Sequence, residues 1–272
     1  MAKTIAVCNQ KGGVGKTSTV LNLGAGLAKE GKKVLLIDSD PQSDLTASAG
    51  IDADSIEKSL GRLMYLATEN YKPVVADTII HHDEGFDLIP SNLDLSSLET
   101  RLVNAMSREK VLDNLLKDVK ENYDYILIDC MPSLGMLTIN ALTAADGVII
   151  PVQAQYLPAK GMTQLLRSID MVRNHTNEQL KIDGIVMTLV DGRTNLAKDV
   201  INAIRTNYGM QIRIFDTQIP IGVKAAEASK MGISLFTYDG ECKPAKAYES
   251  LTKEVIADAE RKRKRDKTSI TR

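Results

Sequence analysis

A glycine-rich segment near the amino terminus limits what this chain can fold into. The segment Gln10–Thr17 reads QKGGVGKT; an apolar strand pattern over Thr4–Cys8 leads into it, and a helical pattern over Lys16–Lys29 follows. The three glycines permit backbone dihedrals that turn several N–H groups toward one point, and the next helix directs its positive end at the same point. The segment therefore predicts a strand–loop–helix unit that binds an anion such as phosphate.

Apolar strand-like runs recur along the chain and alternate with helical patterns. After the first run, the expected strands are Val34–Ile37, Phe86–Ile89, Tyr125–Ile128, Gly147–Val152 and Ile182–Val190. The further expected helices are Leu95–Met106, Arg108–Lys120, Gly135–Ala144, Gly161–His175, Leu196–Tyr208 and one that begins at about Pro244. Apolar strands separated by helices indicate a mostly parallel sheet covered on both faces. We predict one doubly wound α/β domain over residues 1–258 and a basic, flexible tail over 259–272.

The bulk composition narrows the classes of protein to consider. The 272 residues carry a net charge of −1, so any nucleic-acid contact must use a local basic patch. No stretch approaches the roughly 20 apolar residues of a membrane span, and the amino terminus has no signal-peptide pattern. The three cysteines, Cys8, Cys130 and Cys242, form no CxxC pair, which favours reduced, partly buried thiols in the cytoplasm.

The loop residues have distinct expected roles. Gln10 replaces the first glycine of the usual pattern G-x-x-x-x-G-K-[ST], but the remaining glycines keep the loop able to surround phosphate. Lys16 is expected to reach the β- and γ-phosphates, and the Thr17 hydroxyl to bind Mg²⁺. The alternative, a turn that binds nothing, requires the glycines, the Lys-Thr pair and the strand–helix context to coincide. We expect ATP to contact Gly12, Gly13, Val14, Gly15, Lys16, Thr17 and Ser18.

Carboxylates follow two of the expected strands. Asp38 and Asp40 are two residues apart after a buried strand, so their side chains share a face and point to the crevice where α/β sheets bind ligands. Asp129 ends the apolar run Tyr125–Ile128, as an acidic residue does in the Walker B strands that hold Mg²⁺. We therefore expect a metal site formed by Thr17, Asp38 and Asp129.

Three segments together resemble a known family. The KGGVGKT segment Lys11–Thr17 is similar to the signature of the deviant Walker A ATPases, which include ParA, MinD and the nitrogenase iron protein. The segments Asp38–Gln42 and Asp129–Gly135 resemble further motifs of that family, with Met131 where a proline often stands. The resemblance implies the P-loop NTPase fold and an Mg²⁺-dependent ATPase that hydrolyses ATP to ADP and phosphate.

The resemblance also implies how the catalytic residues act. ATP would be held between two subunits, and Lys11 would reach the nucleotide of the partner subunit. Asp40 would position the hydrolytic water, and Asp38 would lie in the outer shell of the metal. The expected catalytic residues are thus Lys11, Lys16 and Asp40.

The second half of the chain resembles one branch of the family. Asp191–Leu196 and the segment around Ile219–Ala228 are similar to motifs of the Soj-like group of chromosomal and plasmid ParA proteins. Carried over, the match implies an adenine contact by Pro220 and Ile221. It also implies DNA contacts by Arg193 and by Lys224, which replaces an arginine. The basic block that contains Arg261, Lys262 and Arg263 is a further candidate DNA contact.

These similarities lead to one expected function and two alternatives. The expected protein is an ATP-dependent DNA partitioning ATPase that acts in the cytoplasm on the nucleoid. Its expected partners are a second copy of the chain, non-specific double-stranded DNA and a ParB-like centromere-binding protein, with no membrane. The alternatives are a MinD-like membrane-positioning ATPase, which would carry an amphipathic membrane helix, and a metal- or cluster-delivery ATPase, which would carry paired cysteines.

Overall fold

The structure is a computed structural model that describes the backbone of residues 2–154 and 159–270, and the side chains of these residues except 159–160 and 262–270. Within them, eight strands form one sheet in the order β3-β4-β2-β5-β1-β6-β7-β8. Their bounds are β1 Lys3–Val7, β2 Val34–Ser39, β3 Ile80–His81, β4 Asp87–Ile89, β5 Tyr125–Cys130, β6 Gly147–Gln153, β7 Lys181–Val190 and β8 Ile214–Pro220. Only β3 and β4 pair antiparallel in this described sheet. The predicted mostly parallel sheet is confirmed.

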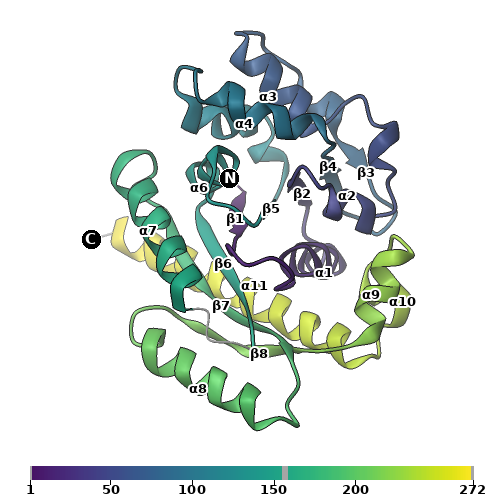
Figure 1. Ribbon diagram of the computed structural model, residues 1–272, viewed down its shortest axis with the longest axis vertical. Coiled ribbons are helices and arrows are strands. Elements are labelled where there is room, and N and C mark those ends of the chain that lie inside the picture. The colour runs from purple at the N-terminus through teal and green to yellow at the C-terminus, as the bar shows by residue number, and fades with distance from the viewer. Residues whose placement is uncertain (1, 155–158, 271–272) are drawn as a thin grey trace.

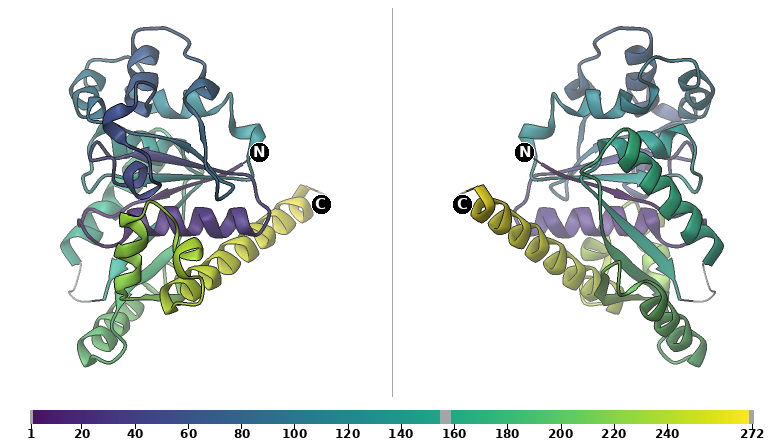
Figure 2. Two further views of the ribbon diagram at one scale, coloured as in Figure 1. Left: turned by 90° about the vertical axis from the view of Figure 1, so that its right-hand side faces the viewer. Right: turned by 90° about the vertical axis from the view of Figure 1, so that its left-hand side faces the viewer.

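Helices cover both faces of the sheet (Figures 1 and 2), as predicted. The α-helices are α1 Lys16–Lys29, α2 Asp44–Ser48, α3 Leu60–Thr68, α4 Asp94–Leu102, α5 Val111–Leu116, α6 Met136–Ala144, α7 Ala159–His175, α8 Asn195–Tyr208, α9 Val223–Lys230, α10 Leu235–Asp239 and α11 Lys243–Ile270. Short 3-10 helices are η1 Ala53–Ser55, η2 Val75–Thr78, η3 Arg108–Lys110 and η4 Lys120–Asn122. None of the described helices has the length and apolar content needed to cross a bilayer.

The strands divide the core because their side chains alternate between the two faces. On β2, Leu35 and Ile37 pack in the core beneath α3 to α8, whereas Val34 and Leu36 pack in the core with α1, α2 and α9 to α11. All four side chains are fully or almost fully buried. Because helices cover both faces of the sheet, consecutive residues of β2 from Val34 to Ile37 are all apolar and all buried.

Several elements differ from the sequence expectations: the helices α2, α3, α9 and α10 are not predicted, and α4 and α5 end earlier than expected, at Leu102 and Leu116. The sequence does not predict the short β3 or the edge strand β8. Of the β8 side chains only Phe215 and Ile219 are buried, and residues 216–218 at its centre are polar. The helix α11 continues to Ile270, past residue 259 where the tail is expected to begin. The division at residue 259 remains a prediction.

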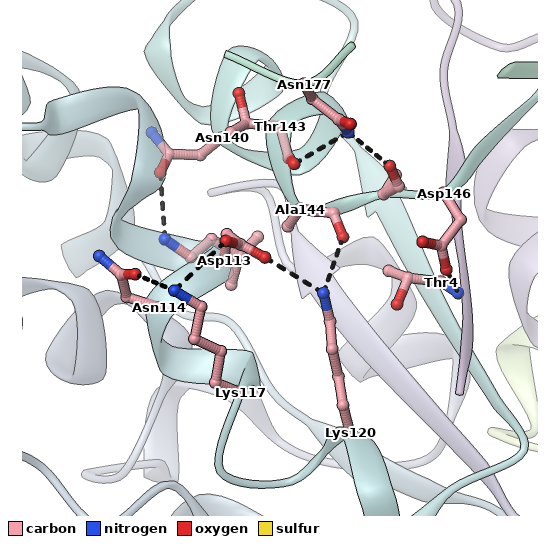
Figure 3. A network of polar contacts seen from close by, with 12 residues as sticks. Thr4, Asp113, Asn114, Lys117, Lys120, Asn140, Thr143, Ala144, Asp146 and Asn177 are labelled. Carbon is pink, nitrogen blue, oxygen red and sulfur yellow. Dashed lines mark hydrogen bonds and ion pairs between the residues drawn. The ribbon is translucent and has the colours of Figure 1, made fainter. Parts of the chain in front are cut away.

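Polar contacts join the helices to the sheet at the end where the parallel strands begin, here called the amino edge (Figure 3). The Asn177 side chain donates to the carbonyls of residues 142, 143 and 145 at the end of α6. Lys120 Nζ donates to Asp113 Oδ1 at 3.1 Å and to the Ala144 carbonyl at 3.3 Å, and the Thr4 amide donates to Asp146 at 2.7 Å. These polar groups form their hydrogen bonds with one another. The candidate site lies at the opposite end of the sheet, where the parallel strands finish.

Candidate functional site

The glycine-rich loop lies between β1 and α1, at the end where the parallel strands finish. Gly13 and Gly15 have φ of 69° and 84°, in the left-handed region that glycine adopts without strain. Gly15 is the N-cap of α1 and no side chain caps this helix, so its first amide groups remain available to an anion. The predicted strand–loop–helix unit is confirmed.

Side chains outside the glycine-rich segment hold the loop in place. Asn9 Nδ2 donates to the Pro151 carbonyl at 2.6 Å, and Asn9 Oδ1 accepts from the Lys11 amide at 3.0 Å. Thr188 Oγ1, on β7, donates to the Val14 carbonyl at 2.7 Å. The sequence predicts neither Asn9 nor Thr188 at the site. Thr188 is not predicted because it lies far from the loop in the chain. Asn9 is not predicted because it belongs to no recognisable motif.

The two loop lysines occupy different environments. Lys16 is only 7% exposed, and its Nζ lies 3.4 Å from the Lys11 carbonyl, so the ammonium group folds back over the loop. Lys11 is exposed, and its Nζ donates to Gln153 Oε1 at 3.2 Å. The positions fit an internal phosphate contact for Lys16 and an outward-facing role for Lys11.

Asp38 and Asp129 stand opposite each other on the neighbouring strands β2 and β5. Asp38 accepts from the amide and the hydroxyl of Thr46 at 2.8 and 2.6 Å, and from the Asp40 amide at 3.2 Å. Burial raises the pKa of Asp38 to about 6 despite these bonds. Burial first, and then the Asp38 charge, raise the pKa of Asp129 well above its ordinary value, whereas Thr17 and Lys16 oppose the shift.

Asp129 is the residue that fits a bound cation. It is 1% exposed, and among the described residues neither of its carboxylate oxygens has a hydrogen bond of normal geometry. A buried carboxylate without a partner is costly, and a divalent cation with oxygen ligands would remove that cost. The Thr17 hydroxyl belongs to the same site, whereas the oxygens of Asp38 are already engaged, which suits a position behind the metal ligands.

A cleft of about 780 Å³ opens above the loop. The predicted residues Gly12, Gly13, Gly15, Lys16, Thr17, Ser18 and Asp40 line it. Residues of α2, α9, the end of β7 and further loops, which the sequence does not predict, complete the lining: Gln42, Asp44, Ala47, Ser48, Pro132, Leu189, Ala226, Ser229 and Lys230. The structure therefore brings the loop and Asp40 together in one space.

Other predicted residues lie outside this lining. Pro220 ends β8 and Ile221 is 52% exposed, and neither contributes to the cleft, so their adenine contact remains a prediction. Arg193 forms a two-point ion pair with Asp191, at 2.8 and 2.9 Å, and Lys224 pairs with Asp239. Of the basic block, Arg261 is exposed. The side chains of Lys262 and Arg263 lie outside the described residues.

Arg193 and Lys224 nevertheless share one region of the molecule. Arg193 follows β7 and Lys224 follows β8, and these strands are neighbours that end with Val190 opposite Pro220. Their ion pairs lower the pKa of Asp191 and of Asp239. The two cations are thus exposed at one edge and are each paired with a nearby carboxylate.

Comparison with known proteins agrees with this arrangement. Residues 2–182 match a protein family described as AAA domain. The chain is 43% identical over 258 residues to the sporulation initiation inhibitor protein Soj of Bacillus subtilis (strain 168), covering 95% of this chain and 100% of that protein. It is 39% identical over 257 residues to the chromosome partitioning protein ParA of Caulobacter vibrioides (strain NA1000 / CB15N), covering 94% of each.

Solved structures give the same result. The chain superposes on cobyrinic acid a,c-diamide synthase from Mycobacterium smegmatis with bound ADP and magnesium, with a TM-score of 0.82, 36% identity and 94% coverage of each chain. It also matches the septum site-determining protein MinD with Mg-ADP from Pyrococcus horikoshii OT3, with a TM-score of 0.72, 25% identity and coverage of 94% and 96%. Fold and site together define a P-loop nucleotide-binding protein. The chain belongs to the ParA/MinD family of partitioning ATPases.

Proposed function

We propose that this protein is an Mg²⁺-dependent ATPase that partitions DNA. The observation that carries the proposal is the convergence of the glycine-rich loop, Lys16 and Asp40 on one cleft, with the unpaired Asp129 carboxylate beside Lys16 and Thr17. Proteins named for chromosome partitioning are similar to this chain over nearly its full length, which supports partitioning as the process. Related structures are described with ADP, an ATP analogue and magnesium, which supports the choice of ligands.

The predicted site residues have separate tasks in this reaction. The loop amides and Lys16 bind the phosphate oxygens and stabilise the negative charge that develops during transfer. Thr17 and Asp129 would hold Mg²⁺, which would supply positive charge to the phosphates, and Asp38 lies behind them. Asp40 is buried but lines the cleft, so its carboxylate accepts a hydrogen bond from the attacking water and orients it.

The outward position of Lys11 supports a dimer that holds ATP between its subunits. Lys11 is exposed at the loop, and in the hydrogen bonds described its side chain contacts only the uncharged side chain of Gln153. Exchange of that contact for a phosphate on a second copy places a further positive charge at the transferred group. Formation of the dimer then depends on the γ-phosphate.

The dimer would bind DNA without reading its sequence. Arg193 and Lys224, at the ends of β7 and β8, are the residues proposed to contact phosphate, with Arg261 to Arg263 as a second source of charge. Two copies in a dimer double each contact. A ParB-like partner would trigger hydrolysis and release the dimer from DNA.

A DNA-binding titration with four nucleotide states tests this function. The full chain is titrated with unrelated DNA duplexes in the presence of no nucleotide, ADP, ATP or a non-hydrolysable ATP analogue, while light scattering records its mass. We expect binding and dimer formation with ATP and the analogue only, with the same affinity for all duplexes. Equal binding in all four states, or none in any state, would contradict the proposal.

The same samples separate the alternatives. Sedimentation with anionic liposomes in the presence of ATP would identify a membrane-positioning ATPase. A metal- or cluster-delivery ATPase would bind iron or another transition metal after anaerobic reconstitution, which elemental analysis detects. Either result without ATP-dependent DNA binding would replace DNA partitioning as the function.

A further inference from the structure

Two cysteine side chains meet next to the proposed nucleotide site. Cys8 directly follows β1 and precedes the loop, and Cys130 directly follows Asp129 at the end of β5. Their Sγ atoms are 2.8 Å apart, and each residue is 1% exposed. An S–S bond is about 2.05 Å long, so a shift of less than about an ångström would bring the sulfurs to bonding distance.

The backbone also suits a bond between these residues. The strands β1 and β5 are parallel neighbours with Val7 opposite Asp129, so the next residues, Cys8 and Cys130, stand side by side. The Cys8 amide still donates to the Ile149 carbonyl at 3.1 Å, so this position remains in the sheet. Neighbouring strands lie about 4.8 Å apart, within the Cα separation of about 4.4–6.8 Å that disulfides span.

We propose that Cys8 and Cys130 are a reversible modification site that forms an intramolecular disulfide when a peroxide oxidises the protein. One thiolate attacks the O–O bond of the peroxide, which forms an S–O bond and releases hydroxide. The second sulfur then attacks the resulting sulfenic acid, which forms the S–S bond and releases water. Overall, two thiols lose two electrons and two protons, and hydrogen peroxide is reduced to two molecules of water.

The segment that follows Cys130 is the part of its surroundings that can open most easily. Residues 131–135 have no regular secondary structure before α6 begins at Met136. Local opening of such a segment costs less than opening the sheet, and hydrogen peroxide is little larger than water. Opening of this segment would expose Cys130 to the oxidant without unfolding the domain.

The bond would join two parts of the site that act on the nucleotide. Cys8 adjoins Asn9, whose side chain fixes the loop. Cys130 directly follows Asp129 and is two residues before Pro132, which lines the cleft. A disulfide would thus fix the distance between the loop and the strand end that holds Mg²⁺. We expect it to slow ATP turnover, a consequence that rests on the proposed function, whereas formation of the bond does not.

The test compares reduced and peroxide-treated full-length protein. Free thiols are alkylated, and the intact mass and the non-reduced peptides are then measured. We expect three alkyl groups on the reduced protein and one on the oxidised protein, a peptide that joins Cys8 to Cys130, and Cys242 as the residue that alkylation still labels. We expect most of the ATP turnover to disappear and to be restored by dithiothreitol.

Single cysteine variants supply the controls. Cys242→Ser should respond to peroxide as the wild type does, whereas Cys8→Ala and Cys130→Ala should form no internal disulfide and keep their turnover. A peptide map in which Cys242 is oxidised and the pair stays reduced overturns the proposal, whether or not the alanine variants fold. If peroxide lowers the ATP turnover of Cys130→Ala as much as that of the wild type, the disulfide does not cause the loss of turnover. If the reduced protein hydrolyses no ATP, the proposed function fails, and the mass measurement still decides the disulfide.

Discussion

The two edges of the same sheet use similar polar residues in opposite ways. At the amino edge, the Asn177 side chain donates to three carbonyls, and the Lys120 ammonium contacts a carboxylate and a carbonyl (Figure 3). At the carboxyl edge, Asp129 is buried with both oxygens unpaired among the described residues, and it stands beside the buried carboxylate of Asp38. The side chains of Asn177 and Lys120 are thus paired within the protein, whereas the Asp129 carboxylate is not paired within the part of the chain that the structure describes.

This difference separates stability from function. Buried polar groups in native proteins are nearly always paired, so an unpaired carboxylate identifies a place where the fold accepts a cost. The cost is removed if a cation or its water binds there. Residues of the amino edge should therefore matter to folding alone, and residues of the carboxyl edge to the ligand, which the following substitutions test.

The largest expected effect is on Lys16. Lys16→Ala removes a charge-assisted contact to phosphate, so we expect ATP affinity to fall about 100-fold or more, and the dimer and DNA binding to disappear with it. Isothermal calorimetry measures the affinity. Lys120→Ala is the matched control at the amino edge: it should keep ATP affinity and lower the free energy of unfolding by about 1 kcal/mol. Retained ATP affinity in Lys16→Ala would remove the basis of the site.

The next largest effect is expected for Asp40, whose substitution should reduce ATP hydrolysis but not ATP binding. Asp40→Ala should keep ATP affinity, reduce hydrolysis about 100-fold or more, and accumulate as an ATP-bound dimer on DNA, because the water loses its orienting carboxylate. Steady-state phosphate release and light scattering measure the two properties. Asp44→Asn is the control, since Asp44 also lines the cleft. If Asp44→Asn abolishes turnover and Asp40→Ala does not, the roles of the two carboxylates are reversed.

The sequence predicts this edge well where the signals are local. The loop, Lys16, Asp38, Asp40 and Asp129 each lie at or just after the end of a strand that is apolar throughout, so their positions follow from the parallel sheet. The strand β8 is different: it lies at the sheet edge and buries few side chains, so its sequence lacks a strand pattern. Without β8, the position of α9 along the cleft could not be predicted.

Contacts between distant segments also escape a sequence argument. The hydrogen bond from Thr188 to the Val14 carbonyl joins β7 to the loop, and the ion pair of Lys224 with Asp239 joins α9 to α10. Neither partner carries a motif that identifies the other. Such pairings depend on the final packing of strands, loops and helices, which composition and periodicity do not determine.

The buried Asp129 carboxylate should lower the stability of the protein when no cation is bound. Its pKa is raised above the ordinary value of 3.8 because of burial first and then the Asp38 charge, so its contribution to stability is present below pH 3.8 and is lost as pH rises through the folded-state pKa. Without nucleotide, Asp129→Asn should therefore melt higher than the wild type, and the difference should grow as pH rises from 3.8 toward the folded-state pKa of Asp129. A gain of about 1 kcal/mol corresponds to about 2–4 °C.

The matched substitution at the amino edge, Asn177→Ala, should lower the melting temperature instead of raising it. Asn177→Ala removes a group that donates to three carbonyls, so we expect a lower melting temperature at every pH. Added Mg²⁺ and ATP should stabilise the wild type and Asn177→Ala, but not Asp129→Asn. Differential scanning calorimetry measures all three proteins. A pH-independent decrease of stability in Asp129→Asn would mean that the carboxylate is not an unpaired buried charge.

The smallest expected effect concerns the exposed cations that follow β7 and β8. In the free protein, Lys224 is paired with Asp239, and Arg193 with Asp191. DNA phosphate must therefore compete with a carboxylate for each cation, and because exposed ion pairs are weak, the competition is modest. Asp239→Asn should raise the affinity of the ATP-bound dimer for DNA about two- to fivefold, whereas Lys224→Ala should lower it.

The salt dependence of binding distinguishes this explanation from a change in folding. Removal of one phosphate contact lowers the slope of log K against log salt by about 0.9, and one substitution alters both subunits of a dimer, so Lys224→Ala and Arg193→Ala should each flatten the slope. Asp239→Asn should keep the wild-type slope, because the phosphate contact itself remains. ATP-dependent dimer formation should be unchanged in all three variants. Equal effects on unrelated duplexes would agree with phosphate contacts, whereas sequence-dependent effects, or failure of Lys224→Ala to form the dimer, would place this residue in base recognition or in the nucleotide site instead.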